Sequence, residues 1–234
     1  EEYTISVDDG NWVTAGVKST SIGFENAVVH EYNQGTTPDI LHHDTHSLFA
    51  DDSVGLLYIG TRSGVSVMQP STNSSTHYTL PAGVHLHDMY HWPSGGENGI
   101  LVLTTSVGLQ SIALLEDGLL SGVIDELVTG EMHLTIPLDT GSGDLDMIGF
   151  GESQNVWKYS VDSEGRIGSV ESVAPLTNAL QQEENATVNA AVHVVLPSDG
   201  PRLFIGTNRG LVMANSSDLS GGFPTSWIFD TSNA

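Results

Sequence analysis

The chain has 234 residues, 38% of them hydrophobic and 15% charged, and its 29 Asp and Glu against six Lys and Arg give a net charge of −23. This charge repels nucleic acid phosphates and anionic lipid headgroups, which excludes both as partners, and it predicts adaptation to salt. The chain contains no cysteine, which excludes disulfides and thiolate chemistry, and no apolar run approaches the roughly 18 residues that cross a bilayer.

The first two units of the chain share one pattern. Residues 1–38 contain YTISVDDGNWVTAG near their start, and this run is similar to HSLFADDSVGLLYIG in residues 39–82. In the second unit, a histidine-containing first strand is followed by predicted strands at 58–61, 65–68 and 77–80, separated by polar or glycine-containing turns. This pattern predicts a four-stranded antiparallel meander.

Three further units follow in chain order. Residues 83–130 repeat the second unit at an offset of 44, which aligns His43, Asp44, Gly55 and Gly64 with His87, Asp88, Gly99 and Gly108. Residues 131–187 hold a weaker copy around Asp146–Gly149 and one predicted short helix or long loop at 176–184. Residues 188–234 contain RLFIGTNRGL, which matches LLYIGTRSGV at an offset of 146. We therefore expect one domain, 1–234, with units at 1–38, 39–82, 83–130, 131–187 and 188–234.

The repeat determines the expected fold class. A single meander cannot bury both of its faces, so the units are predicted to stack face to face, and a period near 45 is typical of blades around a channel. We predict an all-β fold, a β-propeller of about five four-stranded blades or five blades of a larger propeller. The chain starts at a first strand and stops after a last one, so we expect no exchanged strand to close the ring.

The run HSLFADDSVGLLYIGTRSGVSVMQPSTNSSTHYTL resembles propeller repeats from the sensor regions of two-component regulators, in which an inner strand precedes L-W/Y-I-G-T and then G-L. The resemblance covers residues 39–82 and 188–214 well, residues 83–130 fairly, and the other two units poorly. It implies a propeller fold. It leaves the function open, because related repeats occur in sensors, adhesins, secreted binding proteins and enzymes.

Histidines gather on or beside the predicted first strands, which line the channel of a propeller. Alternation places His85, His87 and His91 on one face, and the repeat places His43 with His87 and His193 with His91. His42, His46 and His133 lie on or beside the same strands. With Asp44 and Asp88 nearby, these imidazoles are candidate ligands for a divalent zinc, copper, nickel or iron ion.

Two alternatives to a transition-metal site remain. Channel histidines commonly hydrogen-bond to backbone and water, and we favour this interpretation because Tyr3, Ser47 and Asn189 replace histidine in other units. In either case, acidification would charge the imidazoles and partly neutralise the chain. Separately, the segment Asp139–Asp146 offers oxygen ligands for calcium, but its spacing fits a polar turn better than a known calcium loop.

Three sequons begin at Asn73, Asn185 and Asn215, and together with the acidity they predict a secreted or cell-surface glycoprotein. The favoured function is a non-enzymatic binding or assembly module of a surface layer, filament, adhesin or sensor ectodomain. Its expected partners are other protein subunits, surface glycans or further copies of the chain. The alternative is a propeller hydrolase or lyase with a His/Asp site, with or without a metal ion, at the channel.

Overall fold

The computed structural model describes residues 2–6, 11–16, 20–24, 27–32, 35, 39–138, 143–168, 170–182, 186–197, 200–215 and 226–230. These residues form five four-stranded antiparallel sheets in which strands that follow one another in sequence are neighbours. No helix in this part of the chain has the length and apolar character needed to cross a bilayer. The predicted all-β propeller fold is confirmed.

The strands divide among the sheets in chain order. The first sheet contains β1 (Glu2–Ser6), β2 (Asn11–Gly16), β3 (Thr20–Phe24) and β4 (Ala27–Tyr32). The second contains β5 (Thr45–Asp51), β6 (Leu56–Thr61), β7 (Gly64–Gln69) and β8 (Ser74–Thr79), and the third β9 (Leu86–Trp92), β10 (Ile100–Thr105), β11 (Gly108–Leu114) and β12 (Leu120–Val128). The fourth contains β13 (Met132–Leu138), β14 (Leu145–Gly151), β15 (Val156–Val161) and β16 (Glu171–Ser172), and the fifth β17 (Val188–Leu196), β18 (Gly200–Thr207), β19 (Gly210–Asn215) and β20 (Ser226–Asp230).

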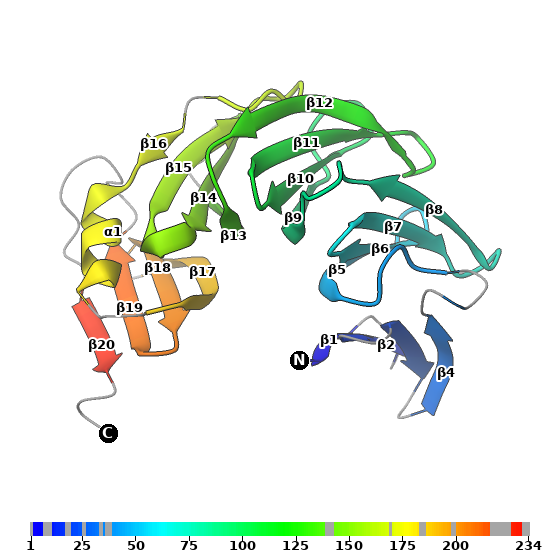
Figure 1. Ribbon diagram of the computed structural model, residues 1–234, viewed down its shortest axis with the longest axis horizontal. Helices are drawn as coiled ribbons and strands as arrows, with labels where there is room; N and C mark the ends of the chain where they lie inside the picture. The colour runs from blue at the N-terminus through cyan, green and yellow to red at the C-terminus, as the bar shows by residue number, and fades with distance from the viewer. Residues whose placement is uncertain are drawn as a thin grey trace.

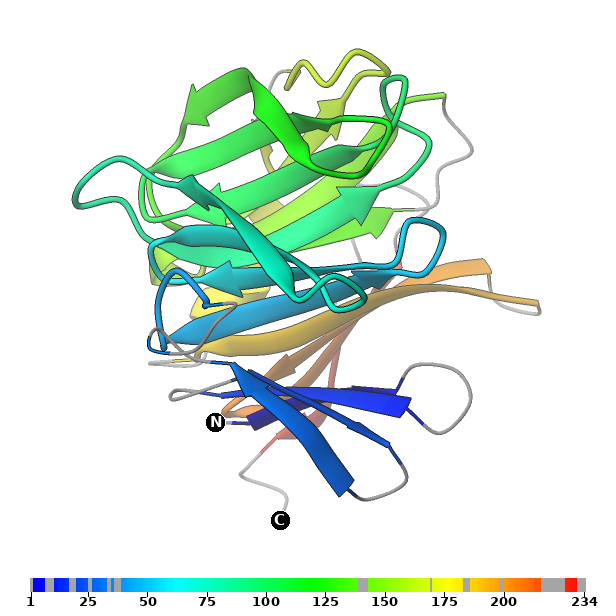
Figure 2. The same ribbon diagram turned by 90° about the vertical axis from the view of Figure 1, so that its right-hand side faces the viewer.

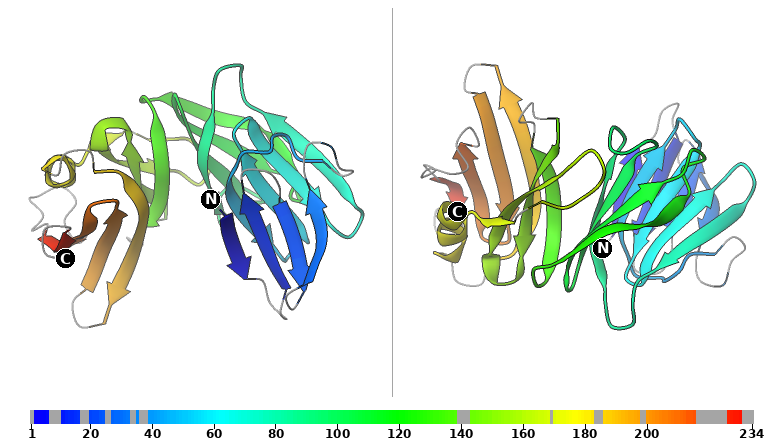
Figure 3. Two further views of the ribbon diagram at one scale, coloured as in Figure 1. Left: turned by 60° about the horizontal axis from the view of Figure 1, so that its bottom comes forward. Right: turned by 90° about the horizontal axis from the view of Figure 1, so that it is seen from above.

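The five sheets follow one another around an arc (Figure 1). The first strand of each sheet lies on the concave side of the arc, and the last strands lie towards its outside (Figure 1). Figure 2 shows the sheets stacked with their faces towards one another. The first and last sheets stand at opposite ends of the arc and remain apart in a second orientation (Figure 3).

Apolar cores form between neighbouring blades. The second blade packs Tyr58, Val65 and Val67 against Leu101 and Leu103 of the third. The third and fourth blades meet through a separate cluster, which includes Val102, Leu109, Met147 and Tyr159. Between the fourth and fifth blades, the helix α1 (Ala174–Gln181) adds Leu176 and Leu180 to the core, which confirms a short helix in the segment predicted at 176–184. From the second sheet to the fifth, the described sheets are therefore stabilised mainly by their neighbours.

The Thr-x-x-Gly repeat has a local structural reason. In three blades the threonine hydroxyl donates a 3.0 Å hydrogen bond to the glycine carbonyl across the two-residue turn; the pairs are Thr61 and Gly64, Thr105 and Gly108, and Thr207 and Gly210. The three glycines have φ values of 140°, 148° and 146°, a region that L side chains rarely adopt. The motif therefore fixes the hairpin between the second and third strands.

The strand register shows that the repeat offset of 44 residues does not hold for the first strands of the second and third blades. Thr61 pairs with Thr45, whereas its equivalent Thr105 pairs with Leu86, so first-strand residues repeat at an offset of 41. The reason is the β9–β10 connection, which is three residues longer than the β5–β6 connection. His46, rather than His43, is therefore the equivalent of His87, and the predicted alignment of His43 with His87 was wrong. The alignment of His193 with His91 is confirmed, because they pair with the equivalent residues Leu203 and Leu101.

Candidate functional site

A β-bulge repeats near the start of the first strand in four blades. One residue in each strand is skipped by the pairing with the second strand: His46 in β5, His87 in β9, His133 in β13 and Asn189 in β17. A bulged residue has no partner in the ladder, so its side chain can point out of the regular alternation. The imidazoles of His46 and His87 lie edge to face with centroids 6.4 Å apart, and those of His87 and His133 lie 5.1 Å apart. We call these three residues the imidazole row.

A carboxylate meets the imidazole row between the third and fourth blades. Oε1 of Glu131, the residue before β13, lies 3.0 Å from Nε2 of His87 and 3.7 Å from Nδ1 of His133. Nε2 of His87 is buried, and it lacks the alignment of a hydrogen bond to that oxygen. Within the described residues, His87, Glu131 and His133 are the one group of three whose ligand atoms all lie within 4.8 Å of one another.

The surroundings of His87 and His46 favour their neutral forms. Burial lowers the pKa of His87, the neighbouring His133 lowers it further, and Glu131 partly opposes these effects. Burial likewise lowers the pKa of His46, against the opposing charge of Asp44, whose Oδ2 lies 3.7 Å from Nε2 of His46. Neutral imidazoles offer lone pairs to a metal ion or to hydrogen-bond donors.

The other predicted metal ligands lie elsewhere, and of the seven predicted positions only His87 belongs to this group. His43 stacks on His42 with ring centroids 4.3 Å apart, in the segment before β5. Asp44 donates its backbone N–H to Nδ1 of His42. His85 precedes β9 and accepts a 3.4 Å hydrogen bond from Nε of Arg62. His193 lies in β17 of the fifth blade, whereas His91 lies in β9 of the third blade, so the fourth blade stands between them.

Asp88 has a structural position beside the imidazole row. Its Oδ1 accepts a 2.8 Å hydrogen bond from the Met89 N–H, and its Oδ2 accepts a 3.2 Å bond from the Thr135 N–H. Burial raises the pKa of Asp88 to about 6, although both hydrogen bonds oppose the shift. The carboxyl thus joins β9 to β13 and holds in place the two strands that carry His87 and His133.

His91 lies in the apolar interface between the second and third blades. Its ring lies 4.4 Å from the ring of Phe49 and stacks at 6.0 Å on that of Tyr58. Both ring nitrogens are buried and have no hydrogen-bond partner among the described residues. Burial lowers the pKa of His91, against the opposing charge of Asp51.

Replacing His91 with leucine is expected to stabilise the protein by about 1 kcal/mol at neutral pH, because it removes two buried polar atoms that lack partners. The gain should grow as the pH falls below 6.5. Unfolded His91 takes up a proton there, whereas the lowered pKa delays protonation in the folded chain, so the wild type loses stability. Urea unfolding of both proteins between neutral and mildly acid pH measures this. A gain that does not change with pH would contradict the proposed cause.

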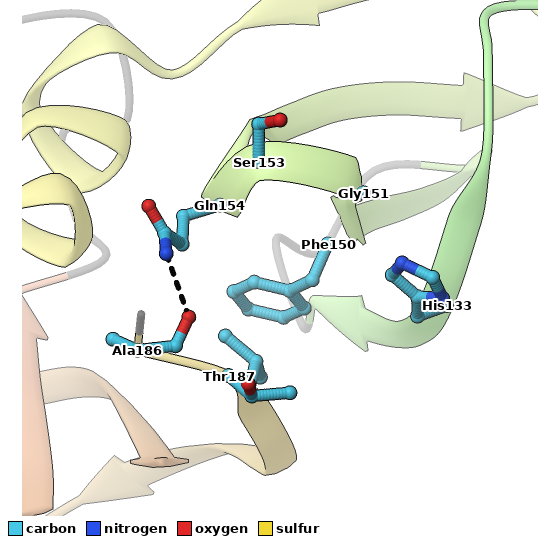
Figure 4. Close-up of a pocket in the computed structure, with 8 residues that line it drawn as sticks. His133, Phe150, Gly151, Ser153, Gln154, Ala186 and Thr187 are labelled. Carbon is cyan, nitrogen blue, oxygen red and sulfur yellow. Dashed lines mark hydrogen bonds between the residues drawn. The ribbon is translucent and has the colours of Figure 1, made fainter. Parts of the chain in front are cut away.

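A cavity of about 470 Å³ lies beside the imidazole row, between the fourth and fifth blades. Its lining includes His133, Phe150 and Thr187, together with Ser153 and Gln154 of the short 3₁₀ turn η1 (Glu152–Gln154). Gln154 donates a 2.8 Å hydrogen bond to the Ala186 carbonyl (Figure 4). Ser153 and Gln154 have φ values of 57° and 60°, which non-glycine residues seldom adopt. The wall of the cavity therefore includes a backbone turn of unusual conformation and polar side chains.

Sequence reasoning placed His133 near the channel but missed Glu131 and this cavity. Glu131 is two residues before His133 at the start of a first strand, and this Glu-x-His spacing was the available signal. Of the predicted glycosylation positions, Asn73 is exposed in the β7–β8 turn, Asn215 is half-buried at the end of β19, and Asn185 lies outside the described residues. Residues 139–142 of the acidic segment also lie outside them. Glycosylation and calcium binding stay predictions.

Comparison with known proteins gives no sequence-level relative. No family model matches the chain. No curated protein matches it either.

Solved structures do resemble it. The WD40 domain of SCAP from fission yeast has a TM-score of 0.58 at 12% identity, over 97% of this chain and 51% of that one. An extracellular domain assigned to a hybrid two-component system of B. thetaiotaomicron has a TM-score of 0.61 at 16% identity, over 99% of this chain and 28% of that one. A functionally unknown protein from Desulfotomaculum acetoxidans has a TM-score of 0.64 at 13% identity, over 97% of this chain and 68% of that one. The chain thus spans about half or less of the first two proteins, and these likenesses show that it has a β-propeller fold.

Proposed function

We propose that the protein is a non-enzymatic assembly module, displayed outside the cell, whose arcs stack end to end on further copies of the chain. The observation that carries this proposal is the outer face of the fifth sheet, on which Val192 is 51% exposed. Cross-strand pairing puts Val192 on the same face as Phe204 and Met213. Ala190 is exposed and Leu211 half-buried on this face, which we call the end face.

The end face corresponds to surfaces that are buried in other blades. By their distance from the Thr-x-x-Gly turn, Phe204, Leu211 and Met213 are equivalent to Tyr58, Val65 and Val67 of the second blade. The latter three side chains are at most 1% exposed, because the third blade covers them. The end face therefore has the chemical character of a surface between blades, and its complement is the opposite face of another blade.

A second copy of the chain can supply that complement. The first sheet stands at the other end of the arc, so end-to-end stacking would place the first sheet of one copy on the end face of the next (Figures 1 and 3). Such a head-to-tail interface builds either rings or filaments. Arg202 lies on the end face, opposite Asn215, and would face an acidic copy. The extracellular location is supported by the exposed sequon at Asn73 and by the acidity.

Sedimentation velocity tests the assembly. We expect the mass to rise with protein concentration, and also as NaCl is raised from about 0.1 M to about 1 M, because screening weakens the repulsion between copies of charge −23. Val192→Asp should shift the assembly back to monomer, since it would bury a charge in the interface. Val123→Asp is the matched control, because Val123 is 45% exposed on β12, away from the end face.

Two results would overturn the proposal. The first is a monomer at every protein and salt concentration, which would indicate closure within one chain or a different protein partner. The second is an equal loss of assembly in Val192→Asp and Val123→Asp, which would indicate non-specific association.

A further inference from the structure

The spacing of His87, Glu131 and His133 suits a small cation. In a tetrahedral zinc site with metal–ligand distances of about 2.0 Å, neighbouring ligand atoms are about 3.3 Å apart. The Glu131 oxygen lies 3.0 Å and 3.7 Å from the two imidazole nitrogens, and all three ligand atoms lie within 4.8 Å of one another. Small side-chain rotations would bring these atoms to equal distances from one ion.

The position of these residues also favours a bound ion. The buried Nε2 of His87 lies 3.0 Å from a carboxylate oxygen of Glu131 without hydrogen-bond alignment, so an imidazole nitrogen and an anionic oxygen lie side by side with no hydrogen bond between them. His87 and His133 are both bulge residues, and Asp88 ties their strands together through the Thr135 N–H. The ligands are therefore held on two connected strands rather than on a surface loop.

We propose that His87, Glu131 and His133 bind one divalent transition-metal ion, with zinc as the expected metal, on the concave side of the arc between β9 and β13. Two imidazoles and one carboxylate are a donor set that zinc accepts, and they leave a fourth position for water or a ligand. The ion would bridge the third and fourth blades. This proposal is independent of assembly at the end face.

Isothermal titration of chelator-treated protein with ZnCl₂ tests the site. We expect one ion per chain and a loss of affinity of more than about 100-fold in His87→Ala, since it removes a direct ligand. Glu131→Gln should also weaken binding, and its partly exposed side chain makes misfolding a small risk. Zinc should raise the Tm of the wild type but not that of the variants, because the ion binds only the folded chain.

His77→Ala is the matched control. Nε2 of His77 lies 3.2 Å from Oδ1 of Asp39, but His77 belongs to no group of three ligands among the described residues. The control should bind zinc as the wild type does. The proposal is overturned if the wild type binds no zinc, or if His87→Ala and Glu131→Gln bind it with unchanged affinity and stoichiometry, since the ion would then be held by other surface groups.

Discussion

Tyr58→Ala is expected to lower the free energy of unfolding by about 4 kcal/mol and the Tm by roughly 10 °C. Tyr58 is fully buried between the second and third blades, and its hydroxyl donates a 2.6 Å hydrogen bond to the Gly118 carbonyl. The substitution removes the ring from a packed interface and leaves that carbonyl without its donor. Urea unfolding at neutral pH measures the loss.

Two variants separate the contributions to this effect. Tyr58→Phe keeps the ring and loses the hydrogen bond, so it should cost about 1 kcal/mol. Phe204→Ala changes the equivalent residue on the end face, which is only half-buried, so in dilute monomer it should cost far less than Tyr58→Ala. An equal loss at both positions would show that the end face is covered within one chain, and would contradict end-to-end assembly.

Gly108→Ala is expected to cost about 3 kcal/mol or more, for two reasons. The φ of Gly108 is 148°, which strains any residue with a Cβ atom. An added Cβ would also lie 2.1 Å from the Leu127 carbonyl oxygen, a backbone atom that cannot move without disturbing the β11–β12 ladder. A large fall in Tm, measured by circular dichroism, is the expected result.

Gly122→Ala is the control within the same sheet. Gly122 lies in β12 opposite Ala113, and no atom lies within 4 Å of its added Cβ. Because alanine restricts the unfolded chain, the substitution should be neutral or stabilising by up to about 1 kcal/mol. Similar losses at both glycines would mean that the Thr-x-x-Gly turn is not the source of the effect.

The fold could be predicted because its signals are local. The turn at Thr61 and Gly64 depends on one hydroxyl, one carbonyl and one unusual φ, so the same letters mark the same hairpin in three blades. The register of the first strands could not be predicted in this way. The β9–β10 connection of the third blade is three residues longer than the β5–β6 connection of the second, and this difference shifted the sequence alignment. The sequence therefore favoured His43 over His46 as the repeat equivalent of His87.

The candidate site could be predicted only in part. His87 and His133 were expected near the channel, but their meeting with Glu131 depends on the packing of β9 against β13, which sequence spacing does not record. His91 was expected beside them, yet strand alternation after the bulge turns it into the core with Phe49 and Tyr58. The cavity depends on η1 and the segment before β17, which belong to different blades.

The repeated bulge has a consequence for how this propeller can change over evolutionary time. The residue skipped at each bulge lies outside the strand alternation that supplies the apolar cores between blades. Histidine, asparagine or another side chain can therefore stand at this position without repacking of those cores. Each bulged blade thus offers one position at which chemistry can vary almost independently of stability. Lineages of this fold could acquire or lose a ligand by single substitutions there, while the apolar residues between the blades stay the same.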